Sequence, residues 1–224
     1  MGESKGVLVL GASGGCGRWF CRLAAARGWA VTALVRPETS FDVPVTRVLR
    51  GNVLDGAFLR PALAGNPVVV CCLGIKRAVP SNPWSKVVSP VNLCTLVSGM
   101  LRDFAPAAGV SRVLAISAAG VGDSRAFVSP AIRWMIDHSK LGIAYSDLEA
   151  MENNFRASGM DWAAVRPVTL INGNPTHAPH IVPRYKITSR IRRADVAAYL
   201  GQLLETPGPL VARTPMIAAG PNTH

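Results

Sequence analysis

The sequence predicts an α/β fold in which a doubly wound parallel sheet carries helices on both faces, and three observations support this. Short, continuous apolar runs alternate with amphipathic stretches of helical period along the chain. Three glycines spaced three residues apart follow the first apolar run directly. The hydrophobic fraction is 49% and the charged fraction 17%, which is typical of a folded globular chain. Strands that alternate with helices need crossover connections, so we expect parallel strands.

Apolar runs bounded by turn residues predict the strands. The first run, at residues 7–10, has the continuous pattern of a strand that is buried on both faces. The further strands are expected at residues 30–35, 47–49, 67–73, 112–117, 161–166 and 215–220.

Stretches with apolar residues at helical spacing lie between these strands. The expected helices cover residues 16–27, 91–104, 145–158 and 193–204. A shorter helix follows Asp55, whose carboxylate can cap it, and Pro61 is expected to end or kink that helix. Because neither a linker nor an internal repeat is visible, we expect residues 1–224 to form a single domain.

Three segments are too long and irregular to be simple connections: residues 74–89, 118–130 and 172–190. Each of them follows an expected strand. In open α/β sheets the ligand lies beyond the carboxyl ends of the strands. We therefore expect these three segments to gather around one ligand-binding cleft.

The formal net charge of +11 indicates a surface that attracts anions. No run of five basic residues occurs, so nucleic acid is not an expected partner, whereas a phosphate-rich small molecule explains part of the charge. No apolar run approaches the ~20 residues that span a bilayer, and no secretory signal is apparent. We expect a cytoplasmic protein that does not bind membranes. A monomer is the default expectation for its oligomeric state.

The five cysteines are odd in number and unevenly spaced, and the four histidines do not complete a ligand set with them. This pattern disfavours both a disulfide framework and a metal site. We expect the cysteines to pack in the core.

The glycine cluster after the first strand indicates a dinucleotide-binding, Rossmann-like turn. Glycine tolerates the positive φ that a sharp strand-to-helix turn needs, and the first turn of a helix has free N–H groups that bind a diphosphate. This strand–turn–helix context is the one that the motif requires. The residues assigned to cofactor binding from this segment are Gly11, Ser13, Gly14, Gly15, Cys16 and Gly17.

Arg36, at the end of the second expected strand, indicates which dinucleotide is bound. An acidic residue at this place would bind the 2′-hydroxyl of NAD, whereas an arginine suits the 2′-phosphate of NADP. Glu38 is the nearest acid and comes two residues late. Arg18 lies close by in the first helix. NADP is therefore predicted over NAD.

Several longer motifs resemble the atypical short-chain dehydrogenase/reductases called NAD(P)H-binding or NmrA-like proteins, a group that includes biliverdin and flavin reductases. The resemblance covers most of the chain. It rests on GASGGCG (11–17), LVR (34–36), RGNVLD (50–55), VVVCCLG (68–74), AISAAGVGDS (115–124), MENNFRASGMDWAAVRPVTLINGN (151–174) and ITSRIRRADVAAYL (187–200).

This resemblance implies further cofactor contacts. Asn52 and Val53 would flank the adenine, although the family usually has aspartate at position 52. Leu73 and Gly74 would lie against the cofactor. Ser117 would lie beside the nicotinamide as a candidate catalytic residue. The residues implied on the carboxamide side are Pro167, Val168 and Thr169, while Arg193 and Asp195 would brace the fold.

The Tyr-x-x-x-Lys pair of typical short-chain dehydrogenases is absent, because Tyr145 is followed four residues later by Glu149. We expect this carboxylate to raise the pKa of the tyrosine rather than lower it. Tyr145 stays a candidate catalytic acid, although a structural role is favoured. Trp134 and Met135 are expected to form a helix packing face.

Hydride transfer is the cofactor's own chemistry, so a protein needs only to hold donor and acceptor together. In residues 74–89, Lys76 and Arg77 could bind anionic groups of an acceptor, and Trp84 could stack on its ring. The predicted function is NADP(H)-dependent reduction of a planar, electron-poor small molecule such as a flavin, quinone or tetrapyrrole. A non-catalytic NADP sensor and a dedicated biosynthetic reductase or isomerase are the alternatives.

Overall fold

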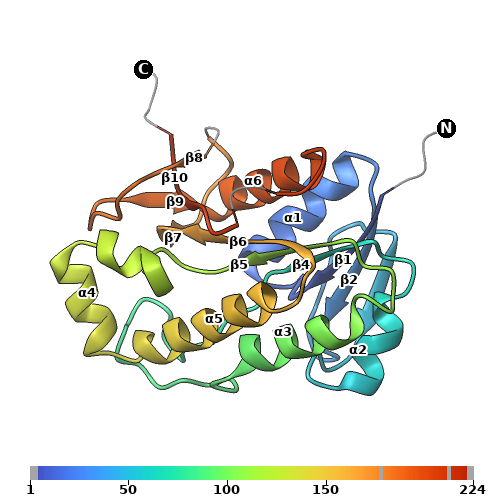
Figure 1. Ribbon diagram of the computed structural model, residues 1–224, viewed down its shortest axis with the longest axis horizontal. Coiled ribbons are helices and arrows are strands. Elements are labelled where there is room, and N and C mark those ends of the chain that lie inside the picture. Colours follow the sequence, from blue (N-terminus) through green and yellow to red (C-terminus); the bar gives the residue numbers. More distant parts are fainter. Residues whose placement is uncertain (1–4, 177–178, 211–212, 221–224) are drawn as a thin grey trace.

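The central element of the computed structural model is an eight-stranded sheet with strand order β3-β2-β1-β4-β5-β6-β10-β8 (Figure 1). The structure describes residues 5–176, 179–210 and 213–220. The paired strands are parallel except β8, which is antiparallel to β10. The strands are β1 (Gly6–Leu10), β2 (Ala30–Val35), β3 (Arg47–Arg50), β4 (Val68–Cys71), β5 (Arg112–Ile116), β6 (Asp161–Pro167), β8 (His180–Ile181) and β10 (Met216–Ala218). The predicted α/β class is confirmed.

Helices cover both faces of this sheet, as Figure 1 shows. On one face lie α1 (Gly15–Ala26) and α6 (Arg193–Glu205). On the other face lie α2 (Gly56–Leu63), α3 (Leu93–Phe104) and α5 (Leu141–Arg156). Asp55 caps α2 as expected, because its Oδ1 accepts a hydrogen bond of 2.9 Å from the Ala57 N–H, and the helix ends two residues after Pro61.

Side-chain alternation along β1 divides the core into two layers. Val7 and Val9 pack in the layer under α1 and α6, whereas Leu8 and Leu10 pack in the layer on the side of α2, α3 and α5. All four side chains are 0% exposed. A strand covered on both faces needs apolar residues at every position, which explains the continuous apolar run.

The three irregular segments contain short elements that the sequence pattern did not reveal. Residues 74–89 form a loop closed by an antiparallel bridge between Arg77 and Val87. Residues 118–130 contain the 3₁₀ helix η1 (Gly122–Phe127), and residues 172–190 contain β8. A separate parallel pair joins β7 (Thr169–Ile171) to β9 (Arg190–Arg192).

The helix α4 (Pro130–Asp137) projects beside α5 at one end of the molecule (Figure 1). Its packing face consists of Ile132 and Ile136, which are buried, with Met135 partly buried against the core. Trp134 is 57% exposed and stacks on His138 instead. The expectation that Trp134 belongs to the packing face is therefore wrong, because it lies two residues from either isoleucine and so points away from their side of the helix.

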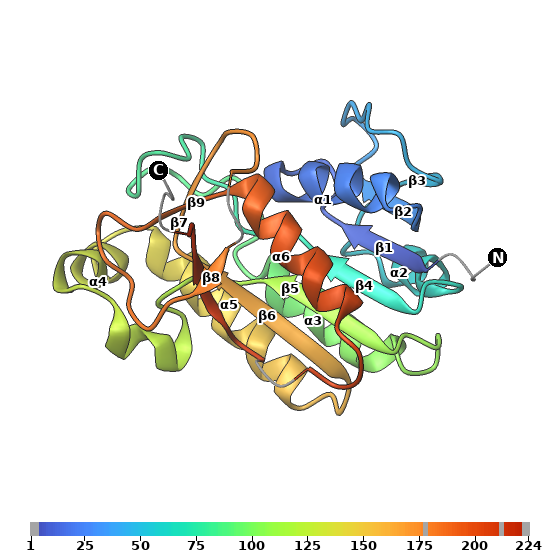
Figure 2. The same cartoon turned by 90° about the horizontal axis from the view of Figure 1, so that it is seen from above.

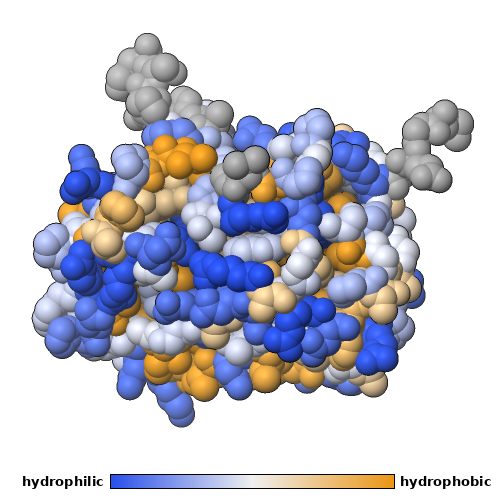
Figure 3. Space-filling view, in the orientation of Figure 1, coloured by the Kyte–Doolittle hydropathy of each residue, from blue (hydrophilic) through white to orange (hydrophobic). Residues whose placement is uncertain are grey.

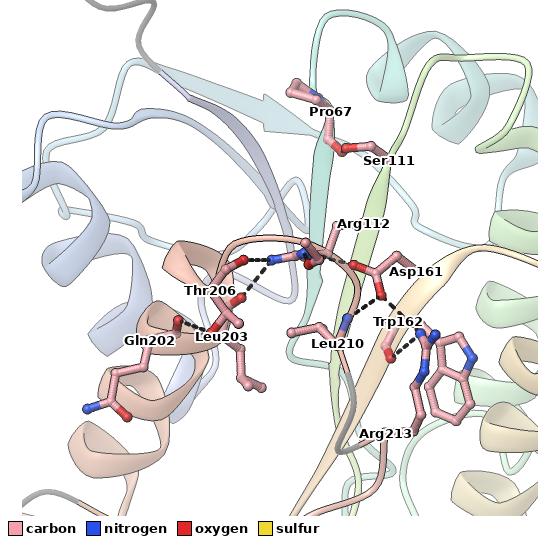
Figure 4. Close-up of polar contacts among 11 residues, drawn as sticks. Pro67, Ser111, Arg112, Asp161, Trp162, Gln202, Leu203, Thr206, Leu210 and Arg213 are labelled. Carbon is pink, nitrogen blue, oxygen red and sulfur yellow. Dashed lines mark hydrogen bonds and ion pairs between the residues drawn. The ribbon is translucent and has the colours of Figure 1, made fainter.

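Hydrogen bonds and ion pairs attach the end of α6 to the sheet (Figure 4). They lie at the amino edge of the sheet, opposite the carboxyl ends of the strands. Arg112 donates to Asp161 Oδ2 at 2.8 Å and to the carbonyls of Leu203 and Thr206, at 2.8 and 2.9 Å. Arg213 donates to Asp161 Oδ1 at 3.0 Å. These arginines are used for structure, so they are not available for a ligand.

The surface seen in Figure 3 is mostly hydrophilic, with separate smaller hydrophobic areas. Within the described residues, none of the helices has the length and apolar character that a membrane span requires.

Candidate functional site

A cavity of about 280 Å³ opens beside the carboxyl ends of β1, β2 and β4, the edge at which the sequence predicts the ligand. Its lining combines the glycine turn, the end of β2, the segment after β3 and the segment after β4. The lining residues are Gly11, Ser13, Gly14, Leu34, Val35, Arg36, Gly51, Asn52, Val53, Leu54, Cys72, Leu73, Gly74, Lys76, Ser89, Pro90 and Leu93. Pro90 and Leu93 were not expected at the site, whereas Ser89 belongs to the segment 74–89 that was expected there.

The glycine turn needs its glycines for two different reasons. Gly11 has φ +74°, and a Cβ there would lie 2.8 Å from the Cys72 carbonyl oxygen. At Gly17 a Cβ would lie only 2.3 Å from the carbonyl oxygen of Gly11, so α1 can approach the strand end closely. Gly14 is the N-cap of α1 and offers no capping side chain. The first turn of α1 therefore keeps N–H groups that can bind an anion.

Arg36 follows β2 directly, lines the cavity and is exposed. Its guanidinium has no hydrogen bond or ion pair with any residue that the structure describes. The loop after it is held by Arg50, whose Nη1 donates to the carbonyls of Pro37 and Thr39 at 3.3 and 2.8 Å. Arg36 is thus a free cation beside a fixed loop.

Arg18, by contrast, is already used by the protein. Its Nη1 forms an ion pair with Asp42, its Nη2 donates to the Ser40 carbonyl at 2.5 Å, and its Nε donates to the Ser13 carbonyl at 3.2 Å. The hydrogen bond from Arg18 lowers the pKa of the Asp42 carboxyl below its ordinary value. Arg18 was expected close to Arg36, but these contacts already use all three of its guanidinium nitrogens.

The far end of the cavity is formed by residues 51–54. Asn52 Oδ1 accepts a hydrogen bond of 3.0 Å from the Leu54 N–H, which leaves its amide Nδ2 free to donate. A Cβ at Gly51 would lie 2.4 Å from the Phe58 ring, so this ring lies directly against the glycine. Val53 lines the cavity beside them.

The segment 74–89 brings only part of the expected acceptor site to the cavity. Lys76 lines it, and within the described part of the chain its ammonium has no partner. Arg77 is bound within its own loop, donating to the carbonyls of Asn82 and Pro80 at 3.2 and 2.6 Å. Trp84 donates from Nε1 to the His138 carbonyl at 2.9 Å and so attaches the loop to the end of α4. Neither Arg77 nor Trp84 lines this cavity.

The residues expected around the nicotinamide lie after β5 and at the end of β6, outside the lining of the cavity. Ser117 is buried, and its hydroxyl donates to Glu152 Oε1 at 2.7 Å. The Val168 N–H donates to the Ile217 carbonyl at 3.0 Å, and Thr169 Oγ1 lies 2.6 Å from the Tyr185 hydroxyl. Pro167 ends β6. Their cofactor contacts stay predictions.

A buried ion network, which the sequence did not reveal, lies behind Ser117. Glu152 is 0% exposed and Arg166 is 1% exposed. Arg166 donates from Nε and Nη2 to the two carboxylate oxygens of Glu152 at 2.9 and 2.6 Å, and Asp123 lies 2.7 Å from Nη2. Burial alone would lower the pKa of Arg166, but hydrogen bonds to Glu152 and Asp123 outweigh it and raise the pKa above its ordinary value. In the sequence, the arginine within the apolar run DWAAVRP could have indicated a buried charge with a partner.

Tyr145 lies at a second cavity of about 320 Å³, which is lined by Gly120, Val121, Gly122, Arg125, Ile136, Asp137, Gly142, Tyr145, Ser146 and Glu149. Its hydroxyl donates to the Ala119 carbonyl at 3.1 Å. Burial raises the pKa of Tyr145 above its ordinary value, the neighbouring Tyr185 raises it further, and Arg125 and Arg77 oppose this. The expected direction of the pKa shift is correct, but its main cause is burial of the hydroxyl rather than the carboxylate of Glu149.

Burial also decides the chemistry of the cysteines, whose thiols are free. It raises the pKa of Cys16 to about 11 and those of Cys21 and Cys71 to about 12. Thiols react as thiolates, so a raised pKa lowers the reactive fraction at neutral pH. We expect iodoacetamide to label these three cysteines much more slowly in the native protein than in urea, as followed by mass spectrometry. Rapid native labelling of any of them would contradict the effect of burial on these thiols.

Solved structures with the same fold include reductases from bacteria. ChuY of Escherichia coli O157:H7, described as an anaerobilin reductase, is 24% identical over 97% of this chain and 98% of its own, with a TM-score of 0.73. SP1627 of Streptococcus pneumoniae, described as a putative NADH-flavin reductase, is 18% identical over 97% of this chain and all of its own (100%), with a TM-score of 0.73. At these identities the likeness shows the fold alone.

A curated relative and a family model extend the comparison to sequence. An uncharacterized chloroplastic protein of Arabidopsis thaliana is 26% identical over 183 residues, which are 78% of this chain and 62% of the relative. The chain thus spans less than two thirds of that relative's length. The model of the family described as NAD(P)H-binding matches residues 11–207, from the first glycine of the turn to the end of α6 and just beyond. With its glycine turn, open helix start and adjoining cavity, the chain belongs to the NAD(P)H-binding family.

Proposed function

We propose that this protein is an NADP(H)-dependent reductase of a planar, electron-poor small molecule, with residues 1–224 acting as one domain. The observation that carries the proposal is Arg36, which has no side-chain partner among the described residues and lies at a cavity that also meets the uncapped start of α1. NADP(H) binding uses both the arginine and the helix start, because the diphosphate of the cofactor requires N–H donors and its 2′-phosphate requires a cation.

The preference for NADP rests on Arg36. A guanidinium can form paired, charge-assisted hydrogen bonds with a phosphate, and this one has no competing partner among the described residues. Glu38, the nearest acid, is not among the residues that line the cavity. A short-chain dehydrogenase/reductase of Veillonella parvula with the same fold, 16% identical, is described in complex with NADP.

The proposal of a conjugated acceptor rests on the hydrogen bonds that the two candidate catalytic residues already make within the protein. Tyr145 donates to a carbonyl and has a raised pKa, and Ser117 donates to Glu152. When bound, the reduced nicotinamide supplies a hydride, and a conjugated acceptor can take its proton from water. The acceptors named for the two reductases of the same fold, anaerobilin and flavin, are of this kind. Lys76 lines the cavity, and its ammonium has no partner in the part of the chain that the structure describes, so it would bind a carboxylate or phosphate of the acceptor or cofactor.

A panel of acceptors tests the proposal. Purified protein is mixed with NADPH and flavin mononucleotide, a quinone or biliverdin, and the absorbance of the reduced nicotinamide is followed. Turnover well above the uncatalysed rate is the expected result. NADPH binding without turnover across the panel would favour the alternative of a non-catalytic sensor, which the engaged hydroxyls of Ser117 and Tyr145 also fit. Turnover of a single acceptor only would favour the dedicated biosynthetic enzyme. The cytoplasmic location stays a prediction.

A further inference from the structure

The starts of α1 and α6 lie side by side at the carboxyl edge of the sheet, as Figure 2 shows. The two helices run in the same direction, because Gly15 contacts Arg193 at their starts and Arg27 contacts Gly201 farther along. Both positive helix ends therefore point toward the same region. Arg193, the first residue of α6, lies at this meeting point.

The side chain of Arg193 crosses directly over the first residue of α1. A Cβ built on Gly15 would lie 2.5 Å from Cδ and 2.9 Å from Nε of Arg193. Any larger residue at position 15 would force the arginine to move. The glycine thus makes room for a guanidinium at the head of α1, although 177 residues lie between the two in the sequence.

Only part of the Arg193 guanidinium is used by the protein. Its Nη1 donates to Asn172 Oδ1 at 2.8 Å, whereas Nε and Nη2 have no hydrogen-bond acceptor in the ranges that the structure describes. Arg193 is half-buried. Its charge also acts on Cys16, where it opposes the larger effect of burial on the pKa of the thiol. A cation with free donors therefore stands against the first turn of α1.

We propose that Arg193 binds the diphosphate of the dinucleotide, from the side opposite the N–H groups of α1. This inference rests on the proposed function. The N–H groups at the head of α1 would bind one side of the diphosphate, and the free Nε and Nη2 of Arg193 would bind the other through charge-assisted hydrogen bonds. The family resemblance implies only that Arg193 braces the fold. Its bond to Asn172 does this, but the remaining donors make it a cofactor ligand as well.

Calorimetry with two ligands tests this role. NADPH contains the diphosphate, whereas adenosine 2′-monophosphate contains the 2′-phosphate that Arg36 would bind but no diphosphate. We expect Arg193→Gln to weaken NADPH binding about tenfold, in line with loss of hydrogen bonds to a charged group, and to leave the monophosphate affinity unchanged. Arg193→Lys, which keeps the charge and most of the stem, should restore part of the loss. Arg190→Gln is the matched control, because Arg190 is exposed nearby and, among the described residues, its side chain donates to the carbonyls of Ile187 and Ser189 alone.

The outcomes separate this inference from the proposed function. Equal affinity of wild type and Arg193→Gln for NADPH would overturn the inference. An equal loss of affinity for NADPH and for adenosine 2′-monophosphate would overturn it too, because it would indicate that Arg193 only braces the fold. If Arg193→Gln does not fold, full wild-type NADPH affinity of Arg193→Lys would overturn the inference as well. Absence of NADPH binding by the wild type would instead overturn the proposed function and, with it, the inference.

Discussion

Arg166→Met should lower the free energy of unfolding by about 3–5 kcal/mol, because it leaves the carboxylate of Glu152 without its main partner in the interior. Glu152 is 0% exposed and takes two hydrogen bonds from Arg166. Ser117 and Arg156 would remain as its donors, but the Arg156 side chain is 44% exposed and compensates poorly. Urea unfolding followed by circular dichroism measures the change.

The double substitution Glu152→Leu with Arg166→Met provides the first control. It removes both buried charges and replaces them with apolar side chains of similar volume, so it should recover most of the stability lost in the single variant. Arg156→Met is the second control and should cost less than about 1 kcal/mol, because it removes only a partly exposed pair. A double variant no more stable than Arg166→Met would show that the loss does not come from the stranded carboxylate.

Arg36→Ala should weaken NADP binding by about 1–3 kcal/mol, the range for hydrogen bonds to a charged group, and should leave NAD binding almost unchanged. The physical reason is that only NADP has the 2′-phosphate that the free guanidinium would contact. Calorimetry with both cofactors measures the two affinities. Arg47→Ala is the control, since Arg47 is an exposed arginine at the opposite end of the neighbouring strand β3.

Two results would contradict this assignment of Arg36. Unchanged NADP affinity would show that the arginine does not contact the cofactor. An equal loss for NAD and NADP would show that it contacts a part that both cofactors share, and the preference for NADP would then need another source.

Local patterns were enough to predict the sheet and the edge at which the cavity lies. The expectation that residues 74–89, 118–130 and 172–190 gather around this one cavity is wrong, because among them residues 74–89 line it whereas residues from 118–130 line the second cavity beside Tyr145. The continuous apolar run of β1 follows from burial on both faces, and the spacing of Gly11, Gly14 and Gly17 follows from the sharp turn into α1. These are properties of neighbouring residues. The segments around Arg36, Asn52 and Leu73 line one cavity, since each follows a parallel strand; Arg36 was singled out by its place after β2, and Asn52 and Leu73 by the family resemblance.

Element ends were less predictable. The helix α5 begins at Leu141, four residues before the expected start at residue 145, because no capping side chain marks its start at Lys140. The short strands β7, β8 and β9 also escaped the sequence pattern, since strands of two or three residues leave no periodicity to detect.

The sequence by itself determined the fold class, the strand–turn–helix that receives a dinucleotide and the family to which the chain belongs. Only the tertiary structure decided which charged groups are available to a ligand. Arg18 pairs with Asp42, and Arg166 pairs with Glu152, while Arg36 has no partner among the described residues. The physical reason is that a charge is neutralised by groups that folding brings beside it, and those groups lie at sequence distances that no local pattern records.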